Sequence, residues 1–102
     1  MHIVFVHINV KPECMEDFVV ATNENAKNSI LEPGIVRFDF FQQVDEPNRF
    51  SLVEIYKSEE DQMKHRETRH YQVWRDTVAN MMAENRIGVK YRNLFPQDDN
   101  WK

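Results

Sequence analysis

The sequence predicts a single α+β domain whose elements follow one another in the order β-α-β-β-α-β. Its 102 residues are enough for one hydrophobic core. Four short segments are strand-like in length and pattern, whereas two longer segments repeat apolar residues at helical spacing. These observations place residues 1–95 in one folded unit and leave residues 96–102 as a polar tail.

The first predicted strand covers residues 2–10, and both of its faces are largely apolar. Such a strand is expected at the centre of a sheet, covered on both sides. Pro12 then opens a helix that is predicted to run to about Leu31, where Glu32-Pro33-Gly34 ends it. The buried stripe of this helix comprises Met15, Phe18, Val19, Thr22, Ala26, Ser29 and Ile30, with Asn25 at its edge.

Two further strands are predicted over residues 35–43 and 49–57, with a turn at residues 45–48 between them. Ser58 can cap a short helix through about Arg66, and Thr68 can cap a second helix of about 15 residues. The apolar stripe of the second helix consists of Tyr71, Trp74, Val78, Met81 and Met82. A last strand is predicted over residues 87–94.

This order is the ferredoxin-like plan, in which a four-stranded antiparallel sheet carries its helices on one face. The other face of the sheet is then left bare. Because the strands are apolar on both sides, a bare face predicts a partner sheet. We therefore expect a homodimer that pairs through the sheet face, which is the arrangement of a dimeric α+β barrel.

The composition excludes several classes of function. The net charge is −4 without a basic stripe, so no nucleic-acid partner is expected. No apolar run approaches the about 20 residues of a membrane span, and no charged leader opens the chain, so we expect a cytoplasmic protein without a membrane partner. Cys14 is the only cysteine, which excludes an intrachain disulfide. With only Gly34 and Gly88, nucleotide-cofactor loops are excluded too.

Residues 65–74 concentrate side chains that could carry chemistry. His65 and His70 titrate near neutral pH, and Tyr71 and Trp74 could form aromatic walls around a flat substrate. The alternative is structural: Tyr71 and Trp74 belong to the core, and His70 is a surface or capping residue. A metal site is not expected, because two histidines five positions apart do not share a helical face.

Glu54 is the second candidate, since it interrupts an otherwise apolar strand face. A buried carboxylate needs a partner or has a raised pKa, and either state suits acid–base chemistry beside a histidine. The alternative is a structural ion pair. Asn25 and Asn9 could donate hydrogen bonds to a developing oxyanion, or could be satisfied polar residues at the edge of the core.

The order and spacing of several segments resemble the antibiotic biosynthesis monooxygenase (ABM) family, whose members are dimeric α+β barrels. The resemblance runs over most of the chain, from about His2 to Phe95. The segments that carry it are the strand at 2–10, Asn25, residues 29–34, Arg37-Phe38-Asp39, the strand at 50–56 with Glu54, His65, and Thr68-x-His70-Tyr71.

The resemblance implies two reactions. Many family members resemble cofactor-independent monooxygenases that oxidise small quinol, phenolic or enolisable substrates with molecular oxygen. One branch of the family instead resembles isomerases of a phosphorylated hydroxydione in autoinducer-2 processing. Ala26 stands where that branch has a histidine, so the monooxygenase is the main prediction and the isomerase is the alternative. A non-enzymatic, ligand-binding dimerisation module is a third possibility.

Both reactions begin with the removal of a proton, and the expected roles are the same. His65 would take the proton, Glu54 would orient His65 or share the proton, and Asn25 would stabilise the oxyanion. The substrate would lie between the sheet and the helices, without a cofactor or a metal ion. The residues expected to contact it are His70, Tyr71, Trp74, Asn9 and Arg37. For the isomerase, the expected phosphate-binding cations are Arg37, Lys57 or Arg69.

Overall fold

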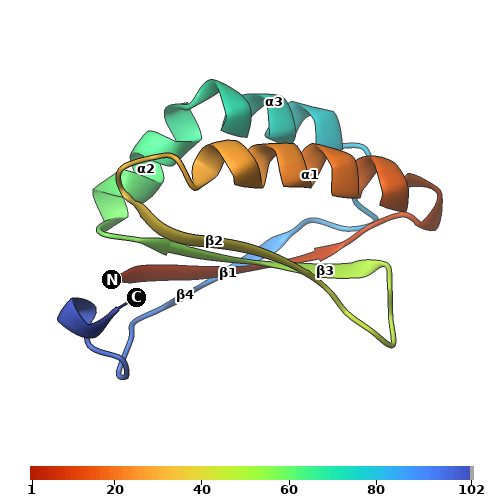
Figure 1. Cartoon of the computed structure of the whole chain (residues 1–102). Helices are drawn as coiled ribbons and strands as arrows, with labels where there is room; N and C mark the ends of the chain where they lie inside the picture. The colour runs from red at the N-terminus through yellow and green to blue at the C-terminus, as the bar shows by residue number, and fades with distance from the viewer. Residues whose placement is uncertain (102) are drawn as a thin grey trace.

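The computed structural model describes residues 1–101, which form one sheet with its helices on one side (Figure 1). The elements in chain order are β1 (His2–Asn9), α1 (Met15–Ser29), β2 (Ile35–Gln42), β3 (Arg49–Tyr56), α2 (Glu59–Glu67), α3 (Arg69–Val78) and β4 (Ile87–Tyr91). Short 3-10 turns cover Pro12–Cys14 and Asp98–Asn100. The strands are antiparallel to their neighbours in the order β2-β3-β1-β4. The predicted ferredoxin-like α+β fold is confirmed.

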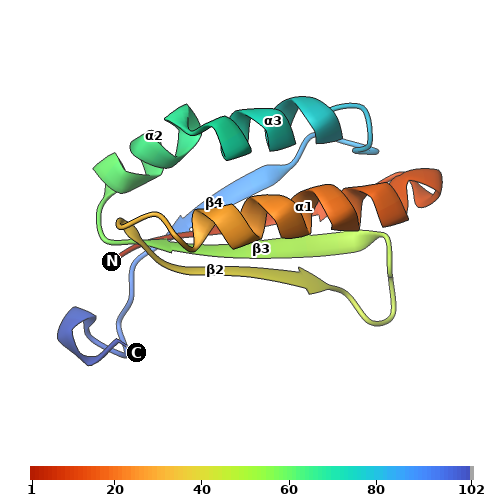
Figure 2. The same cartoon turned by 45° about the horizontal axis from the view of Figure 1, so that its top comes forward.

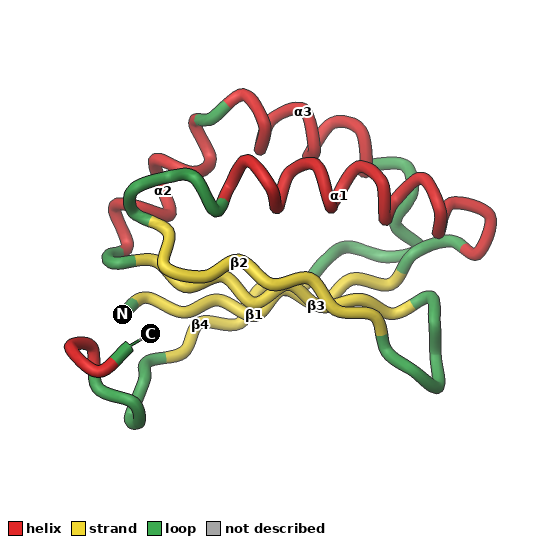
Figure 3. The backbone as a smooth tube through the Cα atoms, viewed as in Figure 1, coloured by secondary structure: helices red, strands yellow, loops and turns green. Residues whose placement is uncertain are grey.

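The helices form one layer above the sheet, with α1 and α3 side by side and α2 leading into α3 (Figure 2). The backbone trace shows no α-helix on the opposite face of the sheet, where the C-terminal segment with its short 3-10 turn lies (Figure 3). Asp98 in this segment holds the N-terminal amino group at 2.8 Å. None of the helices described here is long and apolar enough to span a membrane.

Strand register decides which side chains face the helices. Val4 pairs with Glu54, and Glu54 pairs in turn with Phe38, so these three residues lie on one face of the sheet. Side chains alternate along a strand, so every second residue from these positions points the same way. This face supplies the core residues Val4, Val6, Ile8, Val10, Phe38, Phe50, Leu52 and Tyr56, which pack against Phe18, Trp74 and Val78 of the helices.

The helix that Thr68 caps, α3, is shorter than the predicted length of about 15 residues. It ends at Val78, and Met81 and Met82 lie beyond it instead of on its apolar stripe. The helix ends because the residues that follow it pair with the end of β1. Met82 forms a β-bridge with Val10, and the backbone N–H of Ala83 donates to the carbonyl of Asn9 at 2.8 Å. Tertiary pairing at this point prevails over helical periodicity.

The last strand is also shorter than the predicted residues 87–94, because β4 hydrogen-bonds only to β1. Tyr91 pairs with Ile3, near the start of β1 at His2, so residues after Tyr91 have no strand to pair with. The two edge strands, β2 and β4, expose large apolar side chains on the face of the sheet that the α-helices do not cover. These are Phe41 on β2 and Ile87, Val89 and Tyr91 on β4.

Candidate functional site

A cavity of about 160 Å³ lies between the sheet and the helices α2 and α3. Glu54 reaches it from β3 and His65 reaches it from α2. The chain therefore brings together a carboxyl group and an imidazole that stand eleven positions apart in the sequence. The other lining residues are Val4, Val6, Tyr56, Gln62, Arg66, Tyr71, Trp74, Arg86 and Gly88.

Glu54 is buried beside Tyr56, whose hydroxyl donates a hydrogen bond of 2.5 Å to Oε1 of Glu54. Burial raises the pKa of the Glu54 carboxyl because it disfavours the charged form. The hydrogen bond from Tyr56 and the electrostatic interactions with His65, Arg66 and Arg86 partly oppose this rise in the pKa of Glu54. Burial and the neighbouring Glu54 raise the pKa of Tyr56, so its hydroxyl remains a donor at neutral pH. A neutral Glu54 carboxyl can donate a proton or a hydrogen bond to a substrate oxygen.

Glu32 occupies the position beside His65 that was expected of Glu54 as an orienting group, while the other expectation, that Glu54 shares the proton, stays a prediction. Nδ1 of His65 lies 2.7 Å from Oε2 of Glu32, and Nε2 of His70 lies 2.7 Å from the same oxygen. Since Nδ1 is engaged with Glu32, Nε2 is the nitrogen of His65 that remains for a substrate. Sequence reasoning placed Glu32 at the end of a helix and within the family resemblance but gave it no chemical role, since no spacing rule connects it with histidines 33 and 38 positions away.

Two local features bring Glu32 close to His65 and His70. It lies in the turn between α1 and β2, directly before Pro33 and Gly34, and a Cβ atom at Gly34 would collide with the side chain of Asp61 on α2. Glycine therefore allows this turn to approach the first turn of α2 closely.

Thr68 positions the two histidines by separating α2 from α3. Its hydroxyl donates to the carbonyl of His65 at 2.7 Å and accepts from the backbone N–H of Tyr71 at 3.3 Å. The extended backbone at Thr68 interrupts the helical path between His65 and His70. The argument that histidines five positions apart do not share a helical face holds only within one helix, and here the junction at Thr68 brings both rings to Glu32.

Glu32, His65 and His70 offer ligand atoms within 4.8 Å of one another, a spacing that could accommodate a metal ion. These atoms are already hydrogen-bonding partners of one another, because Oε2 of Glu32 lies beside one nitrogen of each imidazole. We treat the three residues as a hydrogen-bonded triad and call them the Glu32 triad.

Two arginines bring positive charge to the cavity wall. Arg86 donates from Nη2 to the Tyr71 hydroxyl at 3.2 Å, and its guanidinium lies over the Trp74 ring at 5.2 Å from the ring centroid. Arg66 is exposed on α2. Neither arginine forms a salt bridge within residues 1–101. Sequence reasoning missed both, because nothing in the local sequence marks Arg86, in the loop before β4, as a neighbour of α3.

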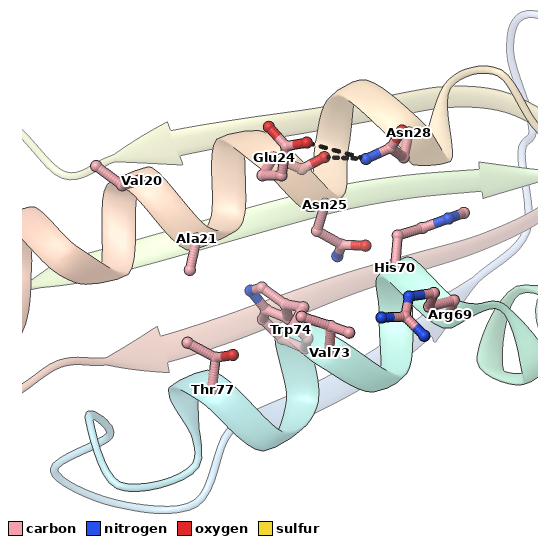
Figure 4. A pocket seen from close by; sticks show the side chains of 10 residues that line it. All are labelled: Val20, Ala21, Glu24, Asn25, Asn28, Arg69, His70, Val73, Trp74 and Thr77. Atoms are coloured by element: carbon pink, nitrogen blue, oxygen red, sulfur yellow. Dashed lines mark hydrogen bonds between the residues drawn. The ribbon is translucent and has the colours of Figure 1, made fainter.

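Asn25 lies in a different hollow from Glu54. Together with His70 and Trp74 it lines a groove of about 580 Å³ between α1 and α3 (Figure 4). Trp74 lines both hollows and separates them, while its ring N–H donates to Thr22 at 3.0 Å. The Asn25 side chain points between the helices, and its buried Nδ2 atom has no hydrogen-bond partner among residues 1–101. Asn25 is thus not placed to stabilise an oxyanion in the cavity beside Glu54.

Asn9 and Arg37 do not line the cavity, which corrects their expected placement. Asn9 lines a hollow at the far end of β1, where its Nδ2 donates to Glu84 at 3.2 Å and its Oδ1 accepts from Asn48 at 2.6 Å. Arg37 lies next to Phe38 on β2 and pairs with Asp39 at 2.6 Å. Strand alternation turns Arg37 away from the helices, because Phe38 faces them.

Lys57 and Arg69, the other cations expected to bind a phosphate, lie outside the cavity as well. Lys57 lines a separate hollow beside Gly34, and Arg69 lines the groove between α1 and α3. Within the cavity the available positive charges are therefore those of Arg66 and Arg86.

Comparison with known proteins gives a consistent family assignment. The profile of the family described as "Antibiotic biosynthesis monooxygenase" matches residues 1–77. An isomerase of (4S)-4-hydroxy-5-phosphonooxypentane-2,3-dione from Klebsiella pneumoniae is 33% identical over 97 residues, which are 95% of this chain and 99% of the relative. The isomerase of the same name from Yersinia enterocolitica is 35% identical to this chain over 96 residues, which are 94% of this chain and all of the relative.

A solved structure from Nitrosomonas europaea that carries the family's name superposes with a TM-score of 0.91 at 48% identity. The match covers 93% of this chain and 100% of that chain. The full-length curated relatives are named as isomerases, which contradicts the predicted monooxygenase reaction and favours the alternative. They are enzymes, so the binding-module alternative finds no support among them. The error arose from giving weight to Ala26, a single position on α1.

Proposed function

The chain belongs to the antibiotic biosynthesis monooxygenase family, and we propose that this enzyme is an isomerase of a small phosphorylated hydroxydione. The observation that carries the proposal is the shared cavity of Glu54, His65 and two arginines without salt-bridge partners in the described chain. The names of relatives that are at least 30% identical over nearly the whole chain supply the substrate class.

The cavity contains the groups that such a reaction needs. In a 4-hydroxy-2,3-dione, the C4–H bond lies beside the C3 carbonyl and is acidic. We assign its removal to Nε2 of His65, which gives an enediolate. A neutral Glu54 carboxyl, hydrogen-bonded by Tyr56, then protonates or stabilises the oxygen on C3. When the proton returns to C3 and the C4 hydroxyl loses its own proton, the carbonyl and hydroxyl groups exchange places and all atoms balance.

Arg66 and Arg86 can bind the phosphate group of the proposed substrate. A phosphate group is recognised best by guanidinium donors that have no competing carboxylate. Arg86 is held in place by Tyr71 and Trp74, so little side-chain freedom is lost when it binds an anion. Arg66 is exposed at the same cavity and can approach a ligand from α2.

The test is conversion of (4S)-4-hydroxy-5-phosphonooxypentane-2,3-dione by the purified protein, followed by NMR in anaerobic buffer. We expect turnover without oxygen, and a loss of kcat of about 10²- to 10⁴-fold in His65→Gln, because a positioned general base contributes this much. His7→Gln is the matched control, since His7 is an exposed histidine of β1 outside the cavity. It should leave kcat unchanged.

The phosphate site has its own test. Arg86→Gln should raise KM for the phosphorylated substrate by about 10- to 100-fold, the effect of losing one hydrogen bond to a charged group. The same substitution should leave the KM of the unphosphorylated hydroxydione nearly unchanged. If the wild-type protein converts neither compound, or if turnover consumes oxygen, the isomerase proposal is wrong.

A further inference from the structure

We propose that Gln62 binds the C2 carbonyl oxygen of the hydroxydione and so makes the enzyme selective for a vicinal dicarbonyl over a simple hydroxyketone. The inference rests on the proposed function and adds a specificity residue to it. In that function Glu54, His65 and the two arginines serve the oxygen on C3, the proton on C4 and the phosphate. The oxygen on C2 has no partner among them.

Gln62 is a buried amide in the wall of the cavity. It lines the cavity from α2 and is 7% exposed. Its Oε1 atom lies 2.6 Å from Nε2 of His2. Because an amide oxygen only accepts hydrogen bonds, Nε2–H of His2 is the donor. The amide nitrogen of Gln62 has no hydrogen-bond partner among residues 1–101, so its two N–H groups remain for a ligand.

His2 decides which end of the amide is left for the ligand. It pairs with Tyr56 across the sheet, so its side chain lies on the face that meets the helices, and α2 lies above this start of β1 (Figure 1). The imidazolium and one neutral tautomer of His2 both carry the Nε2 hydrogen. The hydrogen bond to His2 therefore holds the amide oxygen and leaves the N–H groups on the other branch.

Tyr56 places Gln62 on the same side of the cavity as Glu54. The Tyr56 ring lies 6.0 Å from the ring of His2, between centroids, while its hydroxyl donates to Glu54. The proposed function assigns the oxygen on C3 to Glu54. C2 is bonded to C3 and lies on the side away from the phosphate, which C5 carries. A donor beside Glu54 can therefore meet the oxygen on C2.

Other neutral donors of the wall are engaged elsewhere. The ring N–H of Trp74 donates to Thr22 at 3.0 Å. The Tyr71 hydroxyl accepts from Arg86 at 3.2 Å and so lies at the phosphate end. A site built to hydrogen-bond a substrate oxygen rejects an analogue that lacks it, because the polar group of the site is then left unpaired. Gln62 gives the cavity this kind of selectivity.

The test compares the phosphorylated hydroxydione with its analogue in which a methylene group replaces the C2 carbonyl. The analogue keeps the C3 carbonyl, the C4–H bond and the phosphate, so the same exchange is open to it. We expect Gln62→Met, which has a similar shape and no donor, to lower kcat/KM for the dione by about 3- to 10-fold, the effect of losing one neutral hydrogen bond. For the analogue kcat/KM should not fall. Gln72→Met is the matched control, since Gln72 is exposed on α3 outside the cavity.

His2→Phe tests the positioning role of His2. Without the Nε2 hydrogen the Gln62 amide can turn its oxygen toward the substrate, so the selectivity between the two compounds should fall about as far as in Gln62→Met. His2→Gln supplies a donor again and should restore the selectivity. If His2→Phe lowers kcat/KM for both compounds alike, His2 has only a structural role.

Binding distinguishes a failure of this inference from a failure of the proposed function. Calorimetric titration of the His65→Gln protein, which can hold both compounds without turnover, measures the same selectivity as a ratio of dissociation constants. If Gln62→Met leaves this ratio and the ratio of kcat/KM values unchanged, the inference is wrong and the isomerase proposal stands. If the wild type binds the dione with a preference that depends on Gln62 but does not isomerise it, the inference holds and the proposed function is wrong. A protein that binds neither compound refutes both.

Discussion

Glu54 shows how one buried carboxyl group links chemistry to stability. Burial raises the pKa of Glu54, so the folded protein binds this proton more tightly than the unfolded chain does. The stability that the bound proton contributes is complete below the unfolded pKa and is lost as pH rises through the folded pKa. At neutral pH the residue therefore destabilises the fold. The buried carboxyl group of Glu54 thus costs folding free energy, which is typical of a functional group.

The first prediction concerns Glu54→Gln, which keeps an oxygen to accept the Tyr56 hydroxyl but removes the titration. We expect the variant and the wild type to be equally stable in acid, and the variant to gain relative stability as pH rises above the ordinary range of a glutamate. Urea unfolding between about pH 4 and 8, a range that spans the ordinary and raised values of a carboxyl group, measures the difference. A stability difference that does not change with pH would mean that burial does not govern this carboxyl group.

The second prediction concerns Asn25, whose buried Nδ2 atom lacks a partner in the described chain. Ser29 donates to the backbone carbonyl of Asn25 at 2.7 Å and also faces its side-chain Oδ1 at 3.2 Å, and leucine at position 25 keeps the shorter of these two bonds. Leucine has a similar size and has no polar group to desolvate. We expect Asn25→Leu to leave the free energy of unfolding unchanged or to raise it by up to about 1 kcal/mol.

Chemical denaturation measures the free energy of unfolding of Asn25→Leu, and Thr22→Val is the contrasting variant. Thr22 does accept a hydrogen bond, from Trp74 at 3.0 Å, so its loss should cost about 1–3 kcal/mol by leaving a buried indole N–H unpaired. A similar cost for Asn25→Leu would show that its amide is satisfied in the folded protein. A gain would show that Asn25 is retained for a reason other than stability.

At the scale of single residues, sequence reasoning found the groups that interrupt a pattern. Glu54 stood out in an apolar strand, and His65 stood out in a segment rich in aromatic side chains. Glu32 and Arg86 interrupt no pattern, because each lies in a loop between elements. Their importance comes from loops that fold back on distant segments, and no local spacing encodes such a contact.

At the scale of elements, the junction of α2 and α3 is the decisive feature. Thr68 begins α3 as its N-cap and also holds the last turn of α2 through the carbonyl of His65. One hydroxyl thus links the two helices where they meet, and His65 and His70 reach the same carboxylate on either side of it.

The third prediction follows from this junction. Thr68→Ala should lower the free energy of unfolding by about 0.5–2 kcal/mol, as loss of an N-cap does, and should also lower kcat because the triad loses its alignment. Thr68→Ser keeps the hydroxyl and should restore both. Thermal or urea unfolding and the isomerase assay provide the two measurements.

Ser58→Ala supplies the matched control, since Ser58 caps α2 in the same way through the N–H of Asp61 at 3.3 Å. It should cost a similar free energy without changing kcat, because its hydroxyl contacts no member of the Glu32 triad. If both substitutions reduce kcat equally, the effect is one of general stability, and the proposed role of the junction fails.

At the scale of the whole molecule, the sheet has one covered and one open face. Phe41, Ile87, Val89 and Tyr91 on the open face are 53%, 61%, 37% and 48% exposed. Large apolar side chains gathered on one surface are typical of an interaction site. The expectation that two copies pair through this face stays a prediction.

The fourth prediction tests that pairing. Val89→Lys places a charge on the open face of β4, and we expect it to raise the dimer dissociation constant by at least about 100-fold, since an unpaired buried charge costs several kcal/mol. Sedimentation velocity over a range of concentrations measures this. Val44→Lys is the control, because Val44 is 96% exposed in the turn between β2 and β3. A wild-type protein that sediments as a monomer throughout would refute the prediction.

The sequence alone determined the order of elements and the ferredoxin-like fold, because alternation, helical spacing and capping residues act between near neighbours, and its resemblance to known sequences identified the family. Only the tertiary structure decided which face of each strand meets the helices, where α3 ends, and that Glu32 joins His65 to His70. The physical reason is the same in each case. Hydrogen bonds and packing between segments far apart in the chain set these features, and the free energy of such contacts depends on the whole fold.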